Sequence, residues 1–134
     1  MKKRKILITG ITGSGGSYLA DYLIDNVDNL EIYGLSRWHS TSNNENIINI
    51  QNKIKIIESD MNDFSSVFKA IKLCKPDVIF HLAAHANVRA SFDTPGVVFT
   101  NNSISTLNLL EAVRLNNSNP IIQICSTSEV YGLV

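Results

Sequence analysis

Three glycines, Gly10, Gly13 and Gly16, follow one another at a spacing of three residues near the start of the chain. A tight turn needs one glycine, close approach of backbone to a pyrophosphate needs a second, and packing of a helix on a strand needs a third. Free N–H groups and the dipole at the start of a helix favour negative charge. Ordinary loops also collect glycine, for its positive φ. The apolar run before these glycines and the helical pattern after them favour a dinucleotide-binding turn.

A second candidate position lies where the next predicted strand ends. NAD-binding proteins of this architecture usually carry an acid there, about 20 residues after the glycines, to hold the ribose 2′-hydroxyl. Ser36 occupies this position and Arg37 follows it. Because Ser36 is not an acid, this position has no carboxylate that would repel a 2′-phosphate. The guanidinium of Arg37 is available to bind such a phosphate through paired hydrogen bonds. The alternative is a surface arginine at the start of a polar loop. We predict NADP as the cofactor, in preference to NAD.

Hydroxyl and carboxyl side chains follow the last predicted strand, in the segment Ser126-Thr127-Ser128-Glu129. Ligands of open α/β sheets gather at the carboxyl ends of strands, so Thr127, Ser128 and Glu129 are candidate catalytic residues. Alternatively, the hydroxyls cap a turn and Glu129 is simply solvated. His81 and His85 lie at the end of another strand. We interpret a histidine in such a place as a structural residue with satisfied hydrogen bonds rather than as a catalytic one.

Short β-branched runs alternate with helical patterns along the chain. The runs predict strands over residues 5–9, 31–36, 54–58, 78–82 and 121–125. The helical patterns predict helices over residues 17–27, 64–74 and 97–115, and Asp63 is a suitable N-cap for the second. Residues 37–52 predict a polar loop with a helical turn at 46–50. Alternating strands and helices form a parallel sheet with right-handed crossovers, so the predicted fold class is α/β, a doubly wound parallel sheet.

The composition excludes several classes of protein. The 134 residues suit one domain, and the 12 basic side chains balance the 12 acidic ones, which gives no argument for a nucleic-acid partner. No apolar stretch approaches the ~18 residues of a membrane span, and the run after the basic residues 2–5 is too short for a signal peptide. Cys74 and Cys125 lack metal-type spacing, and we interpret both as buried thiols. We expect a cytoplasmic protein with no metal, membrane or nucleic-acid partner.

The glycine segment, Thr-Gly-x-x-Gly-x-x-Gly, resembles that of the extended short-chain dehydrogenase/reductase family, which contains epimerases and dehydratases. Three further segments resemble this family: Asp60-Met61 after the third strand, His81-Leu82-Ala83-Ala84 at the end of the fourth, and residues 102–112. The resemblance covers essentially the whole chain. Within the family, residues 13–20 and Thr127-Ser128-Glu129 look most like the GDP-mannose 4,6-dehydratases, since the glucose-type dehydratases carry Asp where Ser128 stands.

The resemblance implies that residues 1–134 form a Rossmann domain that binds NADP, and that the substrate is a sugar nucleotide, GDP-mannose. The implied cofactor contacts are Gly10, Thr12, Gly13, Gly16, Arg37, Asp60, Met61, Leu82, Ala83 and Ala84. The resemblance also implies that Glu129 takes the C5 proton of a sugar oxidised at C4, that Thr127 hydrogen-bonds the C4 oxygen, and that Ser128 assists the leaving hydroxyl. Further candidates for contact with the sugar nucleotide are His85, Arg89 and Ser91.

Two family features lie beyond Val134: the Tyr-x-x-x-Lys pair on the helix after the fifth strand, and the segment that binds GDP. We therefore expect the C-terminally truncated cofactor-binding part of a longer enzyme, without turnover by itself, or a fragment that only binds a nucleotide. Another sugar-nucleotide epimerase or reductase of the family is the alternative activity. The long helix pairs with a partner subunit in this family, and the apolar residues Ile104, Leu107, Leu110 and Val113 predict a homo-oligomer.

Overall fold

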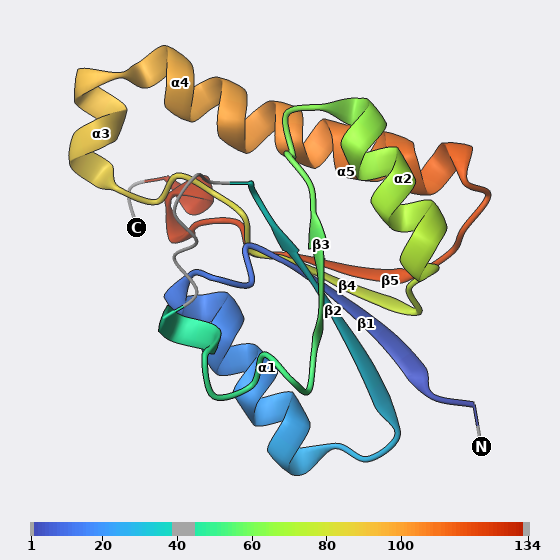
Figure 1. Ribbon diagram of the computed structural model, residues 1–134. Coiled ribbons are helices and arrows are strands. Elements are labelled where there is room, and N and C mark those ends of the chain that lie inside the picture. The colour runs from blue at the N-terminus through green and yellow to red at the C-terminus, as the bar shows by residue number, and fades with distance from the viewer. Residues whose placement is uncertain (1, 39–44, 133–134) are drawn as a thin grey trace.

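The computed structural model describes residues 2–38 and 45–132, which contain a five-stranded parallel sheet. The strands are β1 Arg4–Thr9, β2 Leu30–Ser36, β3 Lys55–Glu58, β4 Val78–His81 and β5 Ile121–Ile124. Their order across the sheet is β3-β2-β1-β4-β5, with β1 at the centre (Figure 1). The order reverses between β1 and β4, and ligands of open α/β sheets bind at such a reversal. The predicted doubly wound α/β fold is confirmed.

The central strand β1 is apolar on both of its faces. Ile6, Leu7 and Ile8 are all buried, and Ile8 lies opposite Gly34 of β2 and Phe80 of β4 in the parallel register. A strand covered on both faces appears in a sequence as a continuous apolar run, whereas a half-buried strand alternates. This is why β1 was recognisable, and its carboxyl end lies between the ends of its two neighbours.

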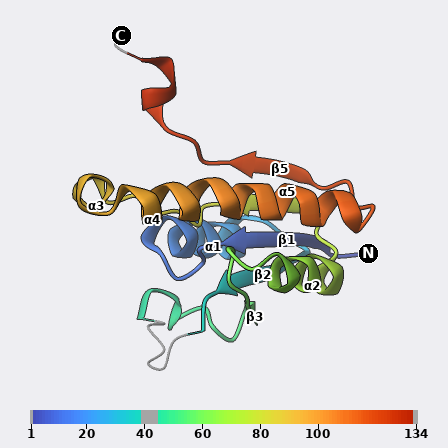
Figure 2. The same ribbon diagram turned by 90° about the horizontal axis from the view of Figure 1, so that it is seen from above.

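Helices cover both faces of the sheet (Figures 1 and 2). Helix α1, Ser14–Asn26, lies on one face, and helices α2, Phe64–Cys74, and α5, Ser105–Leu115, lie side by side on the other. One buried cluster joins α2 and α5 to Leu7 and other sheet residues, and a second joins α1 to the opposite face. The described loop residues before β3 begin with a 3-10 turn at Glu45–Ile47, close to the turn predicted at 46–50.

The observed ends of the elements agree with the predicted ones except at the start of α1. Helix α2 is as predicted, and the Asp63 carboxylate accepts a hydrogen bond from the Ser65 N–H at 2.9 Å. Helix α1 begins at Ser14, three residues before the predicted start, because Gly13 is the extended N-cap and the next glycines form the first turn. Most strand ends lie within a residue of prediction, which is the usual uncertainty of such bounds.

The predicted helix over 97–115 contains an interruption. Helix α4, Pro95–Phe99, passes into a π turn at Thr100–Ile104 and then into α5. A short helix α3, Val88–Asp93, comes before it and was not predicted. Pro95 begins α4, a position that suits proline because the N–H of the first helical residue has no partner inside the helix, so its absence costs no hydrogen bond. A π turn inside a helix often accompanies a functional site.

The apolar stripe that the sequence shows on α5 is only partly buried. Leu109, Ala112 and Val113 are buried, whereas Leu107 and Leu110 are 58% and 42% exposed. Packing against α2 sets this face, because the residues of both helices belong to one cluster. Leu107 and Leu110 are thus exposed members of the apolar stripe on which the prediction of a homo-oligomer rests.

The two cysteines have opposite environments. Cys74 is buried, and its burial raises the pKa of the thiol to about 12. Cys125 is exposed, so its prediction as a buried thiol is wrong. It follows β5, which is one of the two edge strands of the described sheet and is mostly exposed in the part of the chain that the structure describes. Within that part, no helix is long and apolar enough to cross a membrane.

Candidate functional site

The three glycines each have a distinct place at the end of β1. Gly10 has a φ of +70°, and a Cβ on it would lie 3.0 Å from the backbone of Ala83. Gly16 lies in the first turn of α1, where a Cβ would stand 2.4 Å from the carbonyl oxygen of Gly10. Gly13 caps α1 without any side chain, so it covers none of the free N–H groups of the first turn. The turn therefore has the backbone that a bound pyrophosphate requires.

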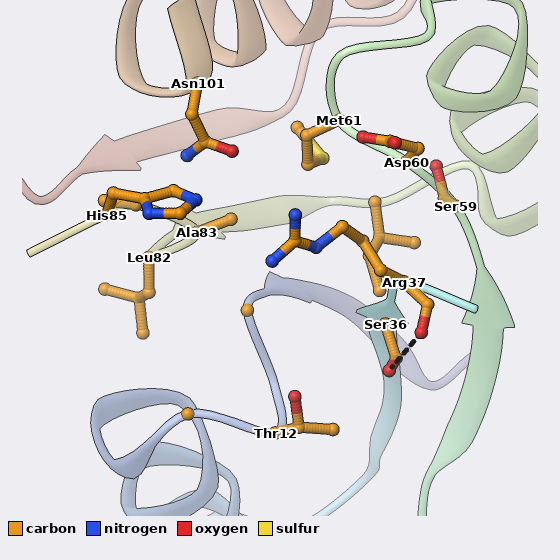
Figure 3. A pocket seen from close by; sticks show the side chains of 14 residues that line it. Thr12, Ser36, Arg37, Ser59, Asp60, Met61, Leu82, Ala83, His85 and Asn101 are labelled. Atoms are coloured by element: carbon orange, nitrogen blue, oxygen red, sulfur yellow. Dashed lines mark hydrogen bonds between the residues drawn. The ribbon is translucent and has the colours of Figure 1, made fainter. Parts of the chain in front are cut away.

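A cavity of about 290 Å³ opens above this turn, at the carboxyl ends of the strands (Figure 3). Its lining residues are Gly10, Thr12, Gly13, Leu35, Ser36, Arg37, Ser59, Asp60, Met61, Leu82, Ala83, Ala84, His85 and Asn101. We call it the dinucleotide cavity. Nine of the ten residues expected to contact a cofactor line it, and Gly16 lies behind the turn instead. The structure therefore brings together residues from four separate strand ends.

Arg37 reaches into the dinucleotide cavity. Figure 3 shows its guanidinium pointing away from the end of β2, toward the side of the cavity where His85 and Asn101 lie. The Ser36 hydroxyl donates to the Arg37 carbonyl oxygen at 3.4 Å. Among the described residues, no carboxylate forms an ion pair with Arg37. An unpaired guanidinium facing a cavity is suited to bind a phosphate.

Asp60 lines the cavity at the end of β3, next to the end of β2, and is held by hydrogen bonds of its own segment. Its carboxylate accepts from the Asn62 N–H at 2.9 Å, and its N–H donates to the Ser66 hydroxyl at 3.1 Å. Ser66 in turn donates to Ser59 at 2.9 Å. These bonds fix the turn after β3, so that the Asp60 backbone and the neighbouring Met61 form a stable wall.

A second cavity, of about 590 Å³, opens at the ends of β4 and β5. It is lined by His81, Leu82, Ala83, Ala84, His85, Ala86, Asn87, Val88, Ser91, Asn102, Thr106, Ile124, Cys125, Ser126 and Thr127. We call it the β5 cavity. It shares residues 82–85 with the dinucleotide cavity, so this loop is the common wall of both. A ligand that spans the two cavities would therefore cross this loop.

The predicted catalytic residues lie at the β5 cavity and just beyond it. Thr127 lines the cavity, and its hydroxyl accepts a hydrogen bond from the Glu129 N–H at 3.2 Å. Ser128 and Glu129 begin a short 3-10 turn, Ser128–Tyr131, whose side chains are exposed. Figure 2 shows this turn extending away from the sheet beyond β5. The structure thus sets Thr127 at the cavity wall, whereas Ser128 and Glu129 do not line the cavity.

The three candidates for substrate contact separate from one another. His85 and Ser91 line the β5 cavity. Arg89 does not line it: its side chain is exposed and pairs with Asp93, four residues later in α3, at 3.6 Å. Arg89 is two positions before Ser91 in α3, so the two side chains need not share a face of the helix, which the sequence alone did not reveal because α3 was not predicted.

His81 is a buried structural residue, as interpreted from the sequence. Its Nδ1 lies 2.8 Å from the Thr9 hydroxyl and its Nε2 lies 3.1 Å from the Thr106 hydroxyl. Burial lowers the pKa of His81 below its usual value, which favours the neutral ring. His81 therefore joins β1, β4 and α5, and it borders the β5 cavity.

Sequence reasoning gave no role to Asn101 and Asn102, which lie in the π turn. Asn101 lines the dinucleotide cavity. The Asn102 amide accepts from the His85 N–H at 2.8 Å and donates to the His85 carbonyl oxygen at 3.2 Å. One signal was present: two adjacent asparagines are unfavourable inside a helix, because their side chains compete for backbone hydrogen bonds.

Comparisons with known proteins agree with this geometry. The family model of GDP-mannose 4,6 dehydratase matches residues 7–134. The human GDP-mannose 4,6 dehydratase is 37% identical over 139 residues, covering 96% of this chain and 37% of the relative. The GDP-mannose 4,6-dehydratase of Yersinia enterocolitica is 36% identical over 140 residues, covering 98% of this chain and 37% of the relative. The chain thus spans little more than a third of the length of these relatives.

Solved structures resemble the fold closely. The UDP-Glc/GlcNAc 4-epimerase of Campylobacter jejuni has a TM-score of 0.83 and 30% identity, covering 96% of this chain and 39% of that protein. The UDP-glucose 4-epimerase of Thermus thermophilus, solved in complex with NAD, has a TM-score of 0.73 and 29% identity over 86% of this chain and 35% of that protein. From the match over residues 7–134, the chain belongs to the GDP-mannose 4,6 dehydratase family.

Proposed function

We propose that this chain is the NADP-binding part of a GDP-mannose 4,6-dehydratase. The observation that carries the proposal is the dinucleotide cavity, in which one space is faced by an uncapped helix start, the Gly10 turn and Arg37, with which no carboxylate of the described residues pairs. The family match supports the substrate class, since relatives of this name align with nearly the whole chain. The complete activity belongs to a protein about the length of those relatives.

The cavity fits a nicotinamide dinucleotide in two respects. A side chain on Gly10 would collide with the backbone of Ala83. Glycine therefore lets the turn after β1 lie against the loop after β4, at the base of the cavity where a pyrophosphate would bind. Arg37 and Ser36 suit a ribose 2′-phosphate, because Arg37 supplies a positive charge and Ser36 carries no negative charge that would repel the phosphate. Asp60 and Met61 would border the adenine, and residues 82–84 the nicotinamide ribose. Bound NADP would accept the hydride from C4 of the sugar and return it at C6, so it would be regenerated.

The residues after β5 would move the protons of this reaction. Thr127 accepts from the Glu129 N–H, which leaves its own hydroxyl proton free to donate to the C4 oxygen. Once C4 is a ketone, the C5 proton is acidic, because the carbanion left behind is an enolate. The Glu129 carboxylate would take that proton, and the C6 hydroxyl would leave as water with the help of Ser128. General base catalysis of this kind is worth ~10²–10⁴-fold in rate.

The sugar nucleotide would enter the β5 cavity, where His85 and Ser91 lie. Arg89 supports the proposal less, because Asp93 already pairs with its guanidinium. The substrate specificity for GDP-mannose rests on the Thr127-Ser128-Glu129 triplet and on the family match.

The experiment uses the polypeptide of the whole reading frame and compares Glu129→Gln with the wild type. Loss of the base should lower turnover of GDP-mannose by ~10²–10⁴-fold and stop exchange of the C5 proton with deuterated solvent, while oxidation at C4 continues. Glu45→Gln, which changes an exposed carboxylate in the turn before β3, is the matched control and should keep full activity. Normal C5 exchange in Glu129→Gln would contradict the assigned base. An epimerase would form no 6-deoxy-4-keto product from either protein.

A further inference from the structure

The Thr9 hydroxyl is fully buried at the point where the end of β1 meets the loop after β4. Its Oγ1 accepts from the N–H groups of Leu82 and Ala83, both at 3.1 Å, and lies 2.8 Å from His81 Nδ1. A threonine oxygen has two lone pairs and one proton. The two N–H groups use both lone pairs, so the third contact must be the Thr9 proton donated to His81 Nδ1.

This direction determines the state of the histidine ring. Since Nδ1 accepts a hydrogen bond, a neutral His81 carries its proton on Nε2. That proton faces the Thr106 hydroxyl at 3.1 Å, and Thr106 donates its own proton to the Asn102 carbonyl oxygen at 2.9 Å. Every donor in the chain then has one acceptor, which is the condition for a polar network in a buried site.

The two ends of this hydrogen-bond chain hold the same loop. At one end, Thr9 binds the N–H groups of Leu82 and Ala83. At the other, the Asn102 side chain binds both the N–H and the carbonyl oxygen of His85. Residues 82–85 are the wall shared by the dinucleotide cavity and the β5 cavity. The hydrogen-bond chain therefore controls the position of residues 82–85, which a ligand that spans both cavities must contact.

We propose that Thr9, His81 and Thr106 form a one-directional hydrogen-bond chain that positions residues 82–85 against the nicotinamide half of a bound dinucleotide. The inference rests on the proposed function and adds positioning residues to it. Thr9 is completely buried and lines neither cavity, so it acts through the loop, whereas His81 and Thr106 also border the β5 cavity. A role confined to stabilising the fold would affect all ligands of the folded protein alike, whereas positioning would affect only the nicotinamide half.

The first test is the tautomer of His81 in the unmodified chain, read from long-range proton–nitrogen NMR correlations. The chain of hydrogen bonds requires a bare Nδ1 and a protonated Nε2 at neutral pH. A proton on Nδ1, or a charged ring, would overturn the proposal. This measurement involves no ligand and no variant, so it decides whether the chain exists even if the proposed function fails.

The second test compares Thr9→Val, which removes the hydroxyl and keeps the shape, with Thr9→Ser, which keeps the hydroxyl. The Kd for NADP should rise about tenfold in Thr9→Val, equivalent to ~1.4 kcal/mol, and stay within about twofold of the wild type in Thr9→Ser. The Kd for 2′,5′-ADP, which lacks the nicotinamide half, should not change in either variant. If Thr9→Val does not fold, Thr106→Val cuts the other end of the chain and should give the same split.

Two outcomes would contradict the positioning role. Equal weakening of NADP and 2′,5′-ADP binding would mean that the hydrogen-bond chain only supports the fold. An unchanged Kd for NADP in the folded Val variants would mean that the hydrogen-bond chain holds no segment that the ligand contacts. If the unmodified chain binds neither ligand, the proposed function itself is wrong, and the positioning role falls with it. The tautomer result distinguishes that case from an error in the hydrogen-bond chain.

Discussion

The carbonyl oxygen of Gly10 lies 2.4 Å from the place where a Cβ on Gly16 would stand. Real side chains do not tolerate such a distance to a backbone atom, so any residue other than glycine would push α1 away from the end of β1. The Gly10–Gly16 contact is therefore what sets the first turn of α1 directly beside the dinucleotide cavity. The neighbouring Gly15 has open space where its Cβ would be.

Gly16→Ala should lower the free energy of unfolding by about 1–3 kcal/mol, because the methyl group overpacks a closed contact. Gly15→Ala is the matched control: it adds the same atoms in the same helical turn and should be neutral or raise stability by up to about 1 kcal/mol. Urea denaturation of both variants measures the difference. Equal effects at the two positions would show that the close contact is not rigid.

The pKa of His81, lowered by burial, makes stability depend on pH. The unfolded chain, with an ordinary histidine pKa near ~6.5, binds the proton more readily than the folded one. The free energy of unfolding should therefore fall as the pH drops from about 6.5 toward the lower folded-state pKa, with a slope of up to ~1.4 kcal/mol per pH unit.

His81→Asn, which does not titrate, is the comparison for this slope. Its stability should be lower throughout but should change less between about pH 6.5 and 5. Glu31 and Glu111, whose pKa values are lowered by Lys55 and Arg114, are common to both proteins and cancel in the difference. Parallel curves for the two proteins would mean that His81 titrates normally in the fold.

The parts of the fold that local chemistry determines were predictable. The continuous apolar run of β1, the glycines after it and the Asp63 cap each depend on neighbours in sequence, and each lies where expected within a few residues. Arg37 was a candidate because the end of β2 has a standard role in this architecture. Its entry into the dinucleotide cavity is consistent with that role.

The parts that tertiary contacts determine were not predictable. The π turn places Asn102 where its side-chain amide bonds the backbone of His85. No periodic pattern in the sequence predicts a contact between residues 17 positions apart. Which residues of α5 are buried depends on how that helix packs against α2, and no buried face was predicted for it from the sequence. Cys125 was interpreted as a buried thiol because the two cysteines lack metal-type spacing, but it follows β5, which is an edge strand.

The two thiols should react very differently in the folded chain. A water-soluble disulfide reagent should modify Cys125, which is exposed, within minutes, and should leave Cys74 intact, because its thiol is buried and has a pKa of about 12. Cys125→Ser should then abolish labelling until the protein is unfolded. Labelling of Cys74 without denaturant would indicate that the space beneath α2 opens readily.

Exposed leucines on α5 lead us to expect self-association. Leu107 and Leu110 lie on the face of α5 that does not pack on α2, and apolar side chains that adjoin one another often mark an interface. Light scattering should give a mass at least twice 14.8 kDa, and Leu107→Glu should shift it toward the monomer. Leu73→Glu, on the exposed side of α2, is the control. A monomer at high concentration would contradict the expectation.

Cofactor preference tests the central claim most directly, and Trp38 makes it measurable. It is the only tryptophan in the sequence, it is adjacent to Arg37, and it is 71% exposed, so its fluorescence can report binding beside the guanidinium. The unmodified chain should bind NADP at least about tenfold more tightly than NAD, a difference of ~1.4 kcal/mol. Arg37→Ala should remove most of this preference by weakening NADP alone.

Arg4→Ala, at the opposite end of β1, is the matched control for loss of one positive charge, and it should keep the preference. The measurement is a titration of all three proteins with NADP and NAD under identical salt, because the attraction between guanidinium and phosphate is screened by ions. The account predicts a ratio of at least about ten in the wild type and in Arg4→Ala, and near one in Arg37→Ala. Equal or tighter binding of NAD by the unmodified chain, or no binding of either dinucleotide, would contradict it.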